Sequence, residues 1–505
     1  MLASGKSIAR CFINKLNFQC TIKCSSEAIH QGALKQSTAP LAQQSFGQPT
    51  PHTHPHLLRE REVIPGIQVD EFIARRVKLM QKIAKCAFEK QTVASPHLVV
   101  IPSATKVYMS DHIPYVFRQN SDFLYFTGCQ EPDSILLLTV KGDSFSSTLF
   151  VRPNDAHSEL WDGPRTGVKA SHSLFKVDQA LSTDDFEKYM FSLMSESKNT
   201  QIWYNNEEIA QPKVHEKLLQ IAKLSDKNFS SPKTLIHELR VIKSQTEIDL
   251  MQKSCQIASL AIAKTIELSK PGISEHEIFA TVDYQCRMRG AEFLAYPPVV
   301  AGGKNANTIH YISNNQVVHD KTMVLMDAGC EFHGYSSDIT RTWPINGTFT
   351  PAQRILYEIV LEVQTELVRK LKYMPSLDQL FQDMFALLSK RLQEENLLPK
   401  DLSGNKLLAA AYTYCPHHVS HYLGMDVHDT PKISRSVQVR PGMIVTVEPG
   451  IYVNAKNQFA PREFYNLGIR IEDDVLITES GPVNLTASCP KEVADVEALA
   501  RLNQT

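Results

Sequence analysis

Short apolar runs alternate with helical segments in the first half of the sequence, between residues 65 and 235. The segments 97–101 and 134–140 are continuous apolar runs of the kind that form buried strands. Such runs recur about every 30 to 40 residues, which leaves room for a helix between successive strands. The pattern therefore predicts an α/β domain over residues 65–238.

After residue 241 the pattern changes to longer helices with explicit initiation signals. Two Ser/Glu pairs have the spacing of a capping box, and one Thr-Pro pair puts proline at the first position of a helix. These signals are Ser244 with Glu247, Ser274 with Glu277, and Thr350 with Pro351. Strand-like runs at 322–343 and 441–477 surround these helices and a fourth helix at 376–391. We expect a second domain over residues 240–505, so that the chain as a whole is of α/β (α+β) class.

The whole chain is nearly neutral. Its 505 residues include 53 Lys and Arg against 54 Asp and Glu, a formal net charge of −1. A nucleic-acid partner would require a basic surface, so this class of function is excluded. The uninterrupted apolar stretches are also much shorter than the ~20 residues that cross a bilayer, so no membrane span is expected.

The first fifty residues depart from this balance, because five basic side chains stand against one acidic one, a net charge of +4. The segment is Ser-rich and amphipathic, and Lys15 interrupts the apolar core that a secretory signal needs, so it predicts a mitochondrial transit peptide. A disordered basic tail is the alternative. Residues 36–56 have too little apolar surface to fold, so 1–55 is expected to be a transit peptide and a disordered linker. The expected location is the mitochondrial matrix, with a cytoplasmic pool as a second location.

Acidic residues stand at the ends of three apolar strands in the second domain. Asp327 ends the run 324–329, and Asp338 follows eleven residues later, with Gly329 and Gly334 between them. These glycines suit a hairpin that would bring the two carboxylates together. Glu448 and Glu472 occupy similar positions in 440–450 and 468–472. Asp473 and Asp474 are expected to be solvated charges at a strand end.

Several carboxylates cannot be buried together unless cations compensate them. Four carboxylates with one imidazole match a pair of divalent metal ions, and oxygen-rich ligands favour Mn²⁺, Mg²⁺ or Fe²⁺. The segment 416–429 offers the imidazole, because it contains His417, His418, His421 and His428. The Glu of the H-E-x-x-H zinc motif is missing there, so that motif is excluded.

The ordered set Asp, Asp, His, Glu, Glu resembles the metallopeptidases of the pita-bread fold. The segments 117–128, 296–303 and 416–429 are similar to the aminopeptidase P family, and the basic leader is similar to that of its mitochondrial members. The resemblance covers residues 65–490. It implies an N-terminal creatinase-like α/β domain followed by a C-terminal pita-bread metallopeptidase domain.

The resemblance also implies a ligand set for two divalent metal ions, with Mn²⁺ as the expected metal. Asp327 would bind one ion, Asp338 and Glu472 would bridge both, and His421 and Glu448 would complete the other. A hydroxide bridging the metals would be the nucleophile.

Other residues take catalytic or substrate-binding roles by the same resemblance. Glu448 would pass a proton to the leaving proline nitrogen. His310 and His428 would contact the peptide carbonyl and the tetrahedral intermediate, and His417 would support them, although packing or capping is an equal alternative for His417 and His418. Substrate-side roles are also expected for three further residues. Arg470 would orient Glu472, and Tyr296 and Tyr452 would form pocket walls.

The implied function is removal of the N-terminal residue from peptides with proline in second position, by a homodimer. The alternatives are a prolidase, which cleaves Xaa-Pro dipeptides with the same ligands, and a non-catalytic pita-bread interaction module. The interaction module is disfavoured because all five ligand positions carry competent side chains.

Overall fold

The structure is a computed structural model, and it describes residues 46–503 except 94, 198 and 227. The described residues belong to one compact unit. The transit peptide predicted for the start of the chain lies outside the described residues. No helix in the described part of the chain combines the length and apolarity that crossing a membrane requires.

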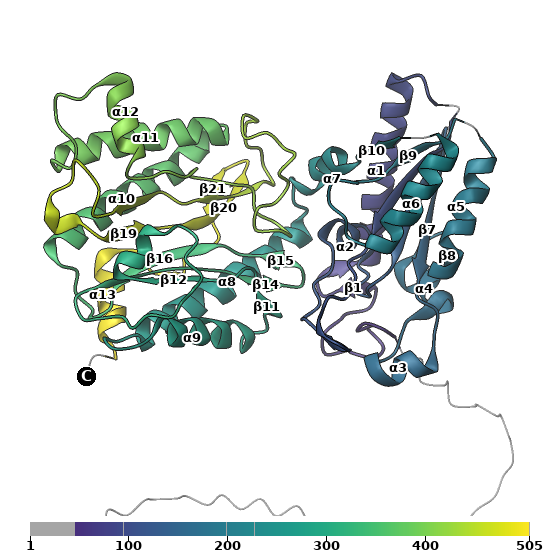
Figure 1. The fold of residues 1–505 in the computed structure, drawn as a ribbon, viewed down its shortest axis with the longest axis horizontal. Helices are drawn as coiled ribbons and strands as arrows, with labels where there is room; N and C mark the ends of the chain where they lie inside the picture. The colour runs from purple at the N-terminus through teal and green to yellow at the C-terminus, as the bar shows by residue number, and fades with distance from the viewer. Residues whose placement is uncertain (1–45, 94, 198, 227, 504–505) are drawn as a thin grey trace, which may run out of the picture. The chain divides into compact units, whose positions relative to one another are not determined.

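The first half contains a six-stranded mixed sheet with the order β10-β9-β3-β6-β7-β8 (Figure 1). The two strands predicted from apolar runs are its centre, where they pair antiparallel and place His97 opposite Val140. The strands are β3 (His97–Pro102), β6 (Ile135–Lys141), β7 (Ser144–Val151), β8 (Gln179–Ser182), β9 (Gln201–Trp203) and β10 (Phe229–Ser230).

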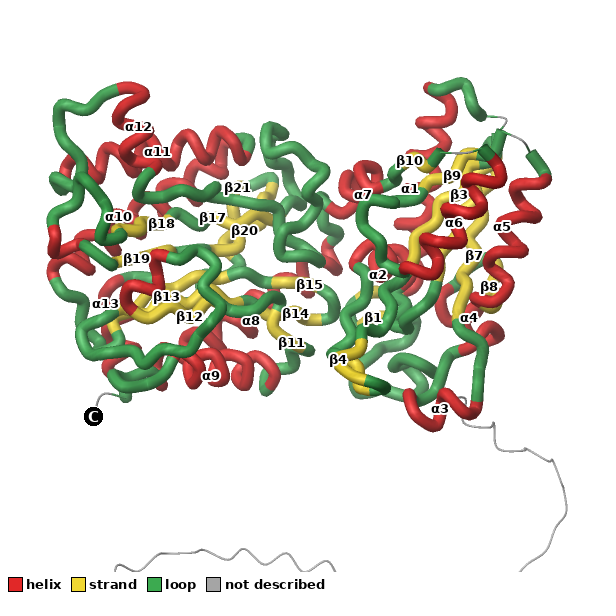
Figure 2. Tube along the Cα trace, viewed as in Figure 1, coloured by secondary structure: helices red, strands yellow, loops and turns green. Residues whose placement is uncertain are grey.

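Helices cover both faces of this sheet (Figure 2). Alternate residues of β3 and β6 pack on opposite sides: Val99 and Leu136 share a core with α1, whereas Leu98 and Leu137 share one with α5 and α6. This two-residue period is that of a strand buried on both faces. The covering helices are α1 (Val69–Glu89), α4 (Gly167–Phe175), α5 (Phe186–Ser195) and α6 (Pro212–Ser225).

Smaller elements complete this half. Two short hairpins are β1 (Glu62–Ile64) with β2 (Ile67–Gln68), and β4 (Tyr108–Ser110) with β5 (Ile113–Pro114). The remaining helices are α2 (Ser121–Thr127), α3 (Ala156–Asp162) and α7 (Lys233–Arg240).

The predicted disordered linker is wrong for the part of it that is described. Gln48 and Thr50 are buried, and the Gln48 amide donates to the carbonyl of Gly128 at 3.1 Å and accepts from the backbone N–H of Gln130 at 2.8 Å. Side-chain hydrogen bonds to a neighbouring loop hold this segment, so it needs little apolar surface of its own.

The second half has the helices that the capping signals predict. Both predicted Ser/Glu capping boxes are present, and Thr350 caps its helix together with Gln353. The apolar stripe of the third helix, which includes Leu356 and Val360, is fully buried. The helices are α8 (Gln245–Leu268), α9 (Glu275–Arg287), α10 (Pro351–Lys370), α11 (Leu377–Glu394), α12 (Gly404–Tyr412) and α13 (Val493–Arg501).

Short antiparallel strands carry the predicted acids between these helices. The sheet order is β12-β13-β16 in one group, β11-β14-β15 in a second, β17-β20-β21 in a third and β18-β19 in a fourth. Their bounds are β11 (Phe293–Leu294), β12 (Val299–Gly302), β13 (Met323–Ala328), β14 (Cys330–Phe332), β15 (Tyr335–Ser336), β16 (Ile339–Pro344), β17 (Ile444–Val447), β18 (Gly450–Val453), β19 (Leu467–Arg470), β20 (Asp473–Thr478) and β21 (Gly481–Asn484).

The predicted hairpin between the two aspartates is confirmed. Strand β13 pairs with β16, and the connection turns at His333 and Gly334, which both have positive φ. Two consecutive residues with positive φ are typical of a tight two-residue hairpin turn.

Candidate metal centre

The hairpin brings Asp327 and Asp338 together. Asp327 lies opposite Thr340 in the β13–β16 ladder, and Asp338 immediately precedes β16. The hydroxyl oxygen of Tyr296 lies 2.6 Å from Asp327 Oδ1 and 2.5 Å from Asp338 Oδ1. One phenolic proton cannot serve both carboxylates, so the pair needs further positive charge.

Glu448 and Glu472 reach the same place from two other strand pairs. Glu448 lies between β17 and β18, and Glu472 between β19 and β20. Glu472 is only 2% exposed and accepts a hydrogen bond of 2.6 Å from Thr340 Oγ1. Thr340 lies opposite Asp327 in the strand ladder. Its hydroxyl therefore fixes the orientation of Glu472 Oε2.

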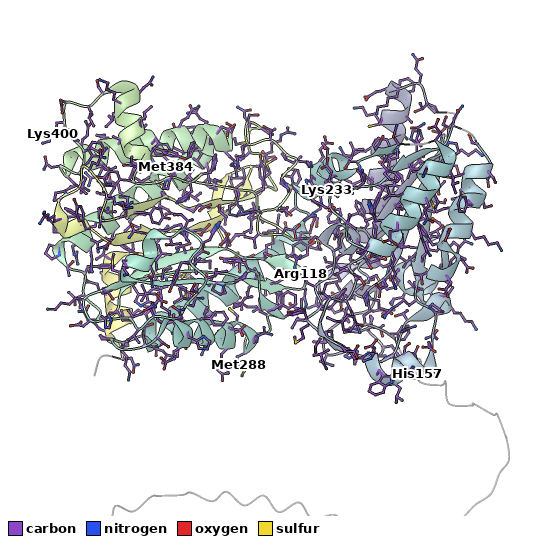
Figure 3. All side chains as sticks on the ribbon, viewed as in Figure 1. Arg118, His157, Lys233, Met288, Met384 and Lys400 are labelled. Carbon is purple, nitrogen blue, oxygen red and sulfur yellow. The ribbon has the colours of Figure 1, made fainter. Side chains whose placement is uncertain are left out.

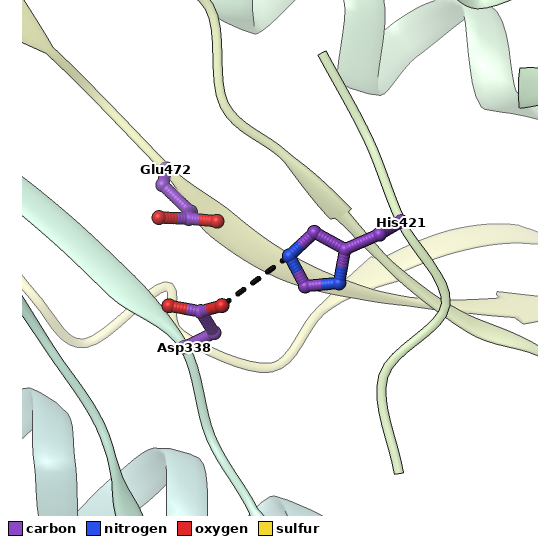
Figure 4. A group of neighbouring side chains, drawn as sticks. All are labelled: Asp338, His421 and Glu472. Carbon is purple, nitrogen blue, oxygen red and sulfur yellow. Dashed lines mark ion pairs between the residues drawn. The ribbon is translucent and has the colours of Figure 1, made fainter. Parts of the chain in front are cut away.

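His421 completes this group. Its Nε2 lies 3.3 Å from Asp338 Oδ2 and 3.7 Å from Glu448 Oε1. Its Nδ1 lies 3.1 Å from the carbonyl of Tyr422, so Nδ1 is the donor and Nε2 faces the carboxylates. One ligand atom each of Asp338, His421 and Glu472 lies within 4.8 Å of the others, and Figure 4 shows the three side chains converging.

The raised pKa values of two acids in this group indicate that its negative charge is not fully compensated. Burial and the neighbouring carboxylates Asp338 and Glu448 raise the pKa of Glu472 well above its ordinary value. Burial, together with Asp338 and Asp327, raises the pKa of Glu448 to about 7. The pKa of His421 is raised to about 9, because the Asp338 and Glu448 carboxylates stabilise its charged form more than burial destabilises it.

These residues fit divalent cations. Apart from the histidines, Arg470 is the one basic side chain among the described residues that lies within ion-pair distance of the four carboxylates. Four carboxylates and one imidazole with so little compensation match the oxygen-rich donor set of hard divalent metals. All five predicted ligand residues are therefore brought together, on four separate segments of the chain.

Arg470 does not orient Glu472 as the sequence suggested. In the described part of the chain its guanidinium donates to Asp327 Oδ2 at 2.6 Å, to Thr340 Oγ1 at 3.0 Å and to Tyr452 Oη at 2.8 Å. Arg470 is the last residue of β19, and Glu472 lies beyond the end of that strand. Arg470 and Glu472 nevertheless meet at one hydroxyl, because Arg470 Nε donates to Thr340 Oγ1 and Thr340 Oγ1 donates to Glu472 Oε2.

Tyr452 joins Arg470 to His417. Tyr452 is 4% exposed, and its hydroxyl donates to His417 Nε2 at 3.0 Å while accepting from Arg470. His417 Nδ1 donates to the carbonyl of His418 at 2.9 Å, so both nitrogens of the His417 ring are engaged. Burial, reinforced by Arg470, lowers the pKa of His417 to about 4, which keeps the ring neutral.

The other predicted site residues lie around this centre. The His428 ring is exposed and contacts His421, with ring centroids 4.5 Å apart. His310 is also exposed, and it is among the neighbours that oppose protonation of His417 and His428. His418 instead stacks on Phe381, at 4.6 Å, which is a packing role. Tyr296 lines a surface cavity of about 580 Å³, and Arg118 is another residue of its lining.

Asp473 and Asp474 are not solvated, and this prediction is wrong. Both are fully buried. Asp473 pairs with Arg341 at 2.7 Å and Lys491 at 2.6 Å, and Asp474 accepts from the backbone N–H of Asp338 at 2.9 Å. Asp474 thus supports the hairpin end that carries Asp338. Sequence reasoning also missed Thr340, although its place on the same face as Asp338 was a usable signal.

Comparison with known proteins finds relatives over most of the chain. Residues 249–479 match metallopeptidase family M24, and residues 72–203 match the aminopeptidase P N-terminal domain. Xaa-Pro aminopeptidase 3 of Homo sapiens is 44% identical over 462 residues, which is 90% of each chain. Intermediate cleaving peptidase 55, mitochondrial, of Arabidopsis thaliana is 38% identical, over 90% of this chain and 87% of that protein.

Solved structures are similar over most of the chain. Aminopeptidase P from E. coli with the inhibitor Pro-Leu has a TM-score of 0.77 and 32% identity, and the match covers 86% of this chain and 98% of that one. Icp55 from Saccharomyces cerevisiae has a TM-score of 0.77 and 32% identity, with 88% and 100% covered.

Proposed function

Because the chain belongs to the aminopeptidase P group of metallopeptidase family M24, we propose that it is a metal-dependent aminopeptidase. Its substrates are peptides with proline in second position, from which it removes the N-terminal residue. The observation that carries this function is the convergence of Asp338, His421 and Glu472 within 4.8 Å in a chain 44% identical to a named Xaa-Pro aminopeptidase.

Five side chains would hold two divalent ions, with Mn²⁺ as the proposed metal. Asp327 would bind one ion, Asp338 and Glu472 would be shared, and His421 and Glu448 would bind the other. When bound, such ions lower the pKa of a coordinated water and polarise the scissile carbonyl. Family M24 is a metallopeptidase family, and a solved relative from E. coli is described as Zn substituted, so the identity of the metal needs a direct test.

The chain's own residues would orient the substrate and move protons. Glu448 faces both His421 and His417, with 3.7 Å from Oε2 to His417 Nδ1, and would carry a proton to the leaving proline nitrogen. His428 and His310 are exposed beside the centre, where their ring N–H groups would donate to the oxygen on which negative charge develops. Arg470, Tyr452 and His417 form one hydrogen-bonded chain that would hold Asp327 in place.

A tripeptide assay tests the activity. Purified protein is given an Xaa-Pro-Xaa tripeptide and an Xaa-Pro dipeptide side by side, with Mn²⁺ and after removal of metal by a chelator. We expect cleavage of the tripeptide that depends on metal. A preference for the dipeptide would favour prolidase activity, and a bound-metal count of zero without cleavage of either peptide would favour an interaction module.

The location proposed for the protein is the mitochondrial matrix. This rests on the net charge of +4 in the first fifty residues and on relatives such as the mitochondrial peptidase of Arabidopsis thaliana. A fluorescent fusion of the whole chain should enter mitochondria, and one lacking residues 1–50 should stay in the cytosol. A homodimer is also proposed, and light scattering on the purified chain measures it.

A further inference from the structure

Glu275 is a buried carboxylate that lies outside the metal centre. It is the first residue of α9 and is fully buried. Each of its two oxygens accepts two hydrogen bonds. The donors are Gly302 N (2.8 Å) and Asn305 Nδ2 (2.8 Å) for Oε1, and Tyr311 Oη (2.8 Å) and Gln316 N (2.9 Å) for Oε2.

All four donors belong to one segment, residues 302–316, and His310 lies within it. Gly302 and Gln316 are the two ends of this segment, and Tyr311 is the residue after His310. The backbone of Glu275 adds a further tie, because its N–H donates to the carbonyl of Gln316 at 2.8 Å. The segment is therefore closed into a loop around a single carboxylate.

The chemistry of this arrangement favours a fixed loop. A buried carboxylate is costly unless hydrogen bonds replace its water, and here four uncharged donors do so. Each bond is lost if the loop moves away, so loop opening would leave Glu275 unsatisfied. The N-terminus of α9 adds favourable interaction with the negative charge.

The loop is also attached to the strands of the metal centre. Gly302 ends β12, which pairs with β13 so that Val299 lies opposite Asp327. On the other side, a Cβ added at Gly468 of β19 would come within 2.5 Å of the Ala306 carbonyl oxygen, so the loop packs tightly against the strand that carries Arg470. Fixing the loop therefore fixes His310 relative to the metal-binding residues.

We propose that Glu275 is a positioning residue that holds His310 in place beside the scissile peptide. The inference rests on the proposed aminopeptidase activity and extends it to a residue that does not touch the substrate. Glu275→Gln keeps the shape of the side chain but replaces one acceptor oxygen with an N–H₂ group, which faces donors instead of accepting from them.

A double-mutant cycle tests this role. Hydrolysis of an Xaa-Pro-Xaa tripeptide is measured for wild type, Glu275→Gln, His310→Ala and the double variant. We expect Glu275→Gln to lower kcat/KM by on the order of 10- to 100-fold, since small misplacements of a catalytic group have effects of this size. In the His310→Ala background the same substitution should change kcat/KM by less than about 2-fold. Glu277→Gln is the matched control: Glu277 is exposed and caps the same helix start, and glutamine can accept the same bond from Ser274 N–H, so this variant should retain wild-type activity.

Trypsin provides a readout that does not depend on activity. Lys304 is the one trypsin site in the loop, and it is exposed. Glu275→Gln should accelerate cleavage after Lys304 several-fold in the metal-loaded protein, whereas Glu277→Gln should not. Unchanged cleavage would overturn the inference, and so would a Glu275→Gln effect of equal size with and without His310.

The two proposals fail in distinguishable ways. If wild type does not cleave the tripeptide, the proposed function is wrong. If wild type is active but His310→Ala matches it, or Glu275→Gln matches it, the positioning role is wrong while the activity stands.

Discussion

Asp338 and Glu472 are the two carboxylates that we propose to be shared by both metal ions. One oxygen of each lies within 4.8 Å of the other and of a His421 ring nitrogen, and both residues are at most 5% exposed. An amide at either position keeps the shape but removes a negative charge and one acceptor. The resulting site would hold cations less tightly, because less of their charge is compensated.

We therefore expect Asp338→Asn and Glu472→Gln each to lower kcat on the Xaa-Pro-Xaa tripeptide by at least about 100-fold, a larger effect than that of residues outside the ligand set. Metal content measured on the purified variants should fall in parallel. Glu479→Gln, an exposed acid just after β20, is the control and should behave as wild type. Near-normal turnover in either variant would refute the assignment of these acids as ligands.

Thr340 stabilises the metal centre through two hydrogen bonds. Its hydroxyl donates to Glu472 Oε2 and accepts from Arg470 Nε, so it links a carboxylate of the centre to the guanidinium that holds Asp327. Thr340→Val keeps the shape of the side chain and removes both bonds. We expect Mn²⁺ affinity to drop about 10- to 100-fold, as measured by titrating metal into the stripped protein. The exposed Thr348→Val is the control, and equal affinities in the two variants would contradict this role.

At the scale of elements, local signals predicted most of the architecture. The capping boxes at Ser244 and Ser274 and the glycine of the β14–β15 turn, Gly334, are local features, and each forms the structure that its spacing indicates. Local signals did not predict the partners of Asp473 or Arg470. The burial of Asp473 depends on Arg341 and Lys491. The partners of Arg470 lie on β13, β16 and β18, so neither environment follows from the residues next to it in the sequence.

The five proposed metal ligands were predicted from a family resemblance. Two residues that support them, Asp474 and Thr340, were not predicted. Asp474 and Thr340 matter because of the groups that they meet across strands, the backbone N–H of Asp338 and the Glu472 carboxylate. Alternation places Thr340 on the face of Asp338, but it does not identify Glu472 as its partner. Arg470 is connected to Glu472 through the Thr340 hydroxyl, which bonds both side chains, and not through the direct hydrogen bond that the resemblance implied.

Helix α7 contains a buried histidine that predicts how stability depends on pH. His237 is 1% exposed, and its Nδ1 accepts from the backbone N–H of Lys432 at 3.1 Å. Burial lowers its pKa to about 4, with Arg240 and Lys233 adding to the shift and Asp122 and Asp429 opposing it. Below its ordinary pKa of about 6.5 the unfolded chain binds a proton that the folded chain does not, so stability falls as pH decreases from about 6.5 to about 4.

Between pH 7 and pH 5 this histidine should remove about 2 kcal/mol from the free energy of unfolding. Urea unfolding at both pH values measures the loss for wild type and for His237→Gln, whose side-chain oxygen can still accept from Lys432. The variant should lose about 2 kcal/mol less than wild type over the same interval. Parallel losses in the two proteins would show that His237 is not responsible.

At the scale of the whole molecule, a buried arginine connects the two halves of the described chain. Arg240 is 2% exposed and pairs with Asp122 of α2 at 2.5 Å, and with Asp426 at 2.8 Å and Asp429 at 2.5 Å. The last two residues belong to the loop that carries His421 and His428. Lys233, labelled in Figure 3 with Arg118, adds a second cation against Asp122 at 2.9 Å. The first half therefore supplies the cation that pairs with the acids of the loop carrying His421 and His428.

Asp122→Asn tests whether this connection serves activity as well as stability. Removing one partner leaves the buried charge of Arg240 less compensated, so the free energy of unfolding should fall by about 3 kcal/mol. Because Arg240 also holds Asp426 and Asp429, the loop with His428 should become less ordered, and kcat on the tripeptide should fall about 10-fold at a temperature where the variant remains folded. The exposed Asp185→Asn, in the same half of the chain, should change neither quantity. A variant that loses stability but keeps full kcat would mean that the first half holds the fold together without influencing the chemistry of the second.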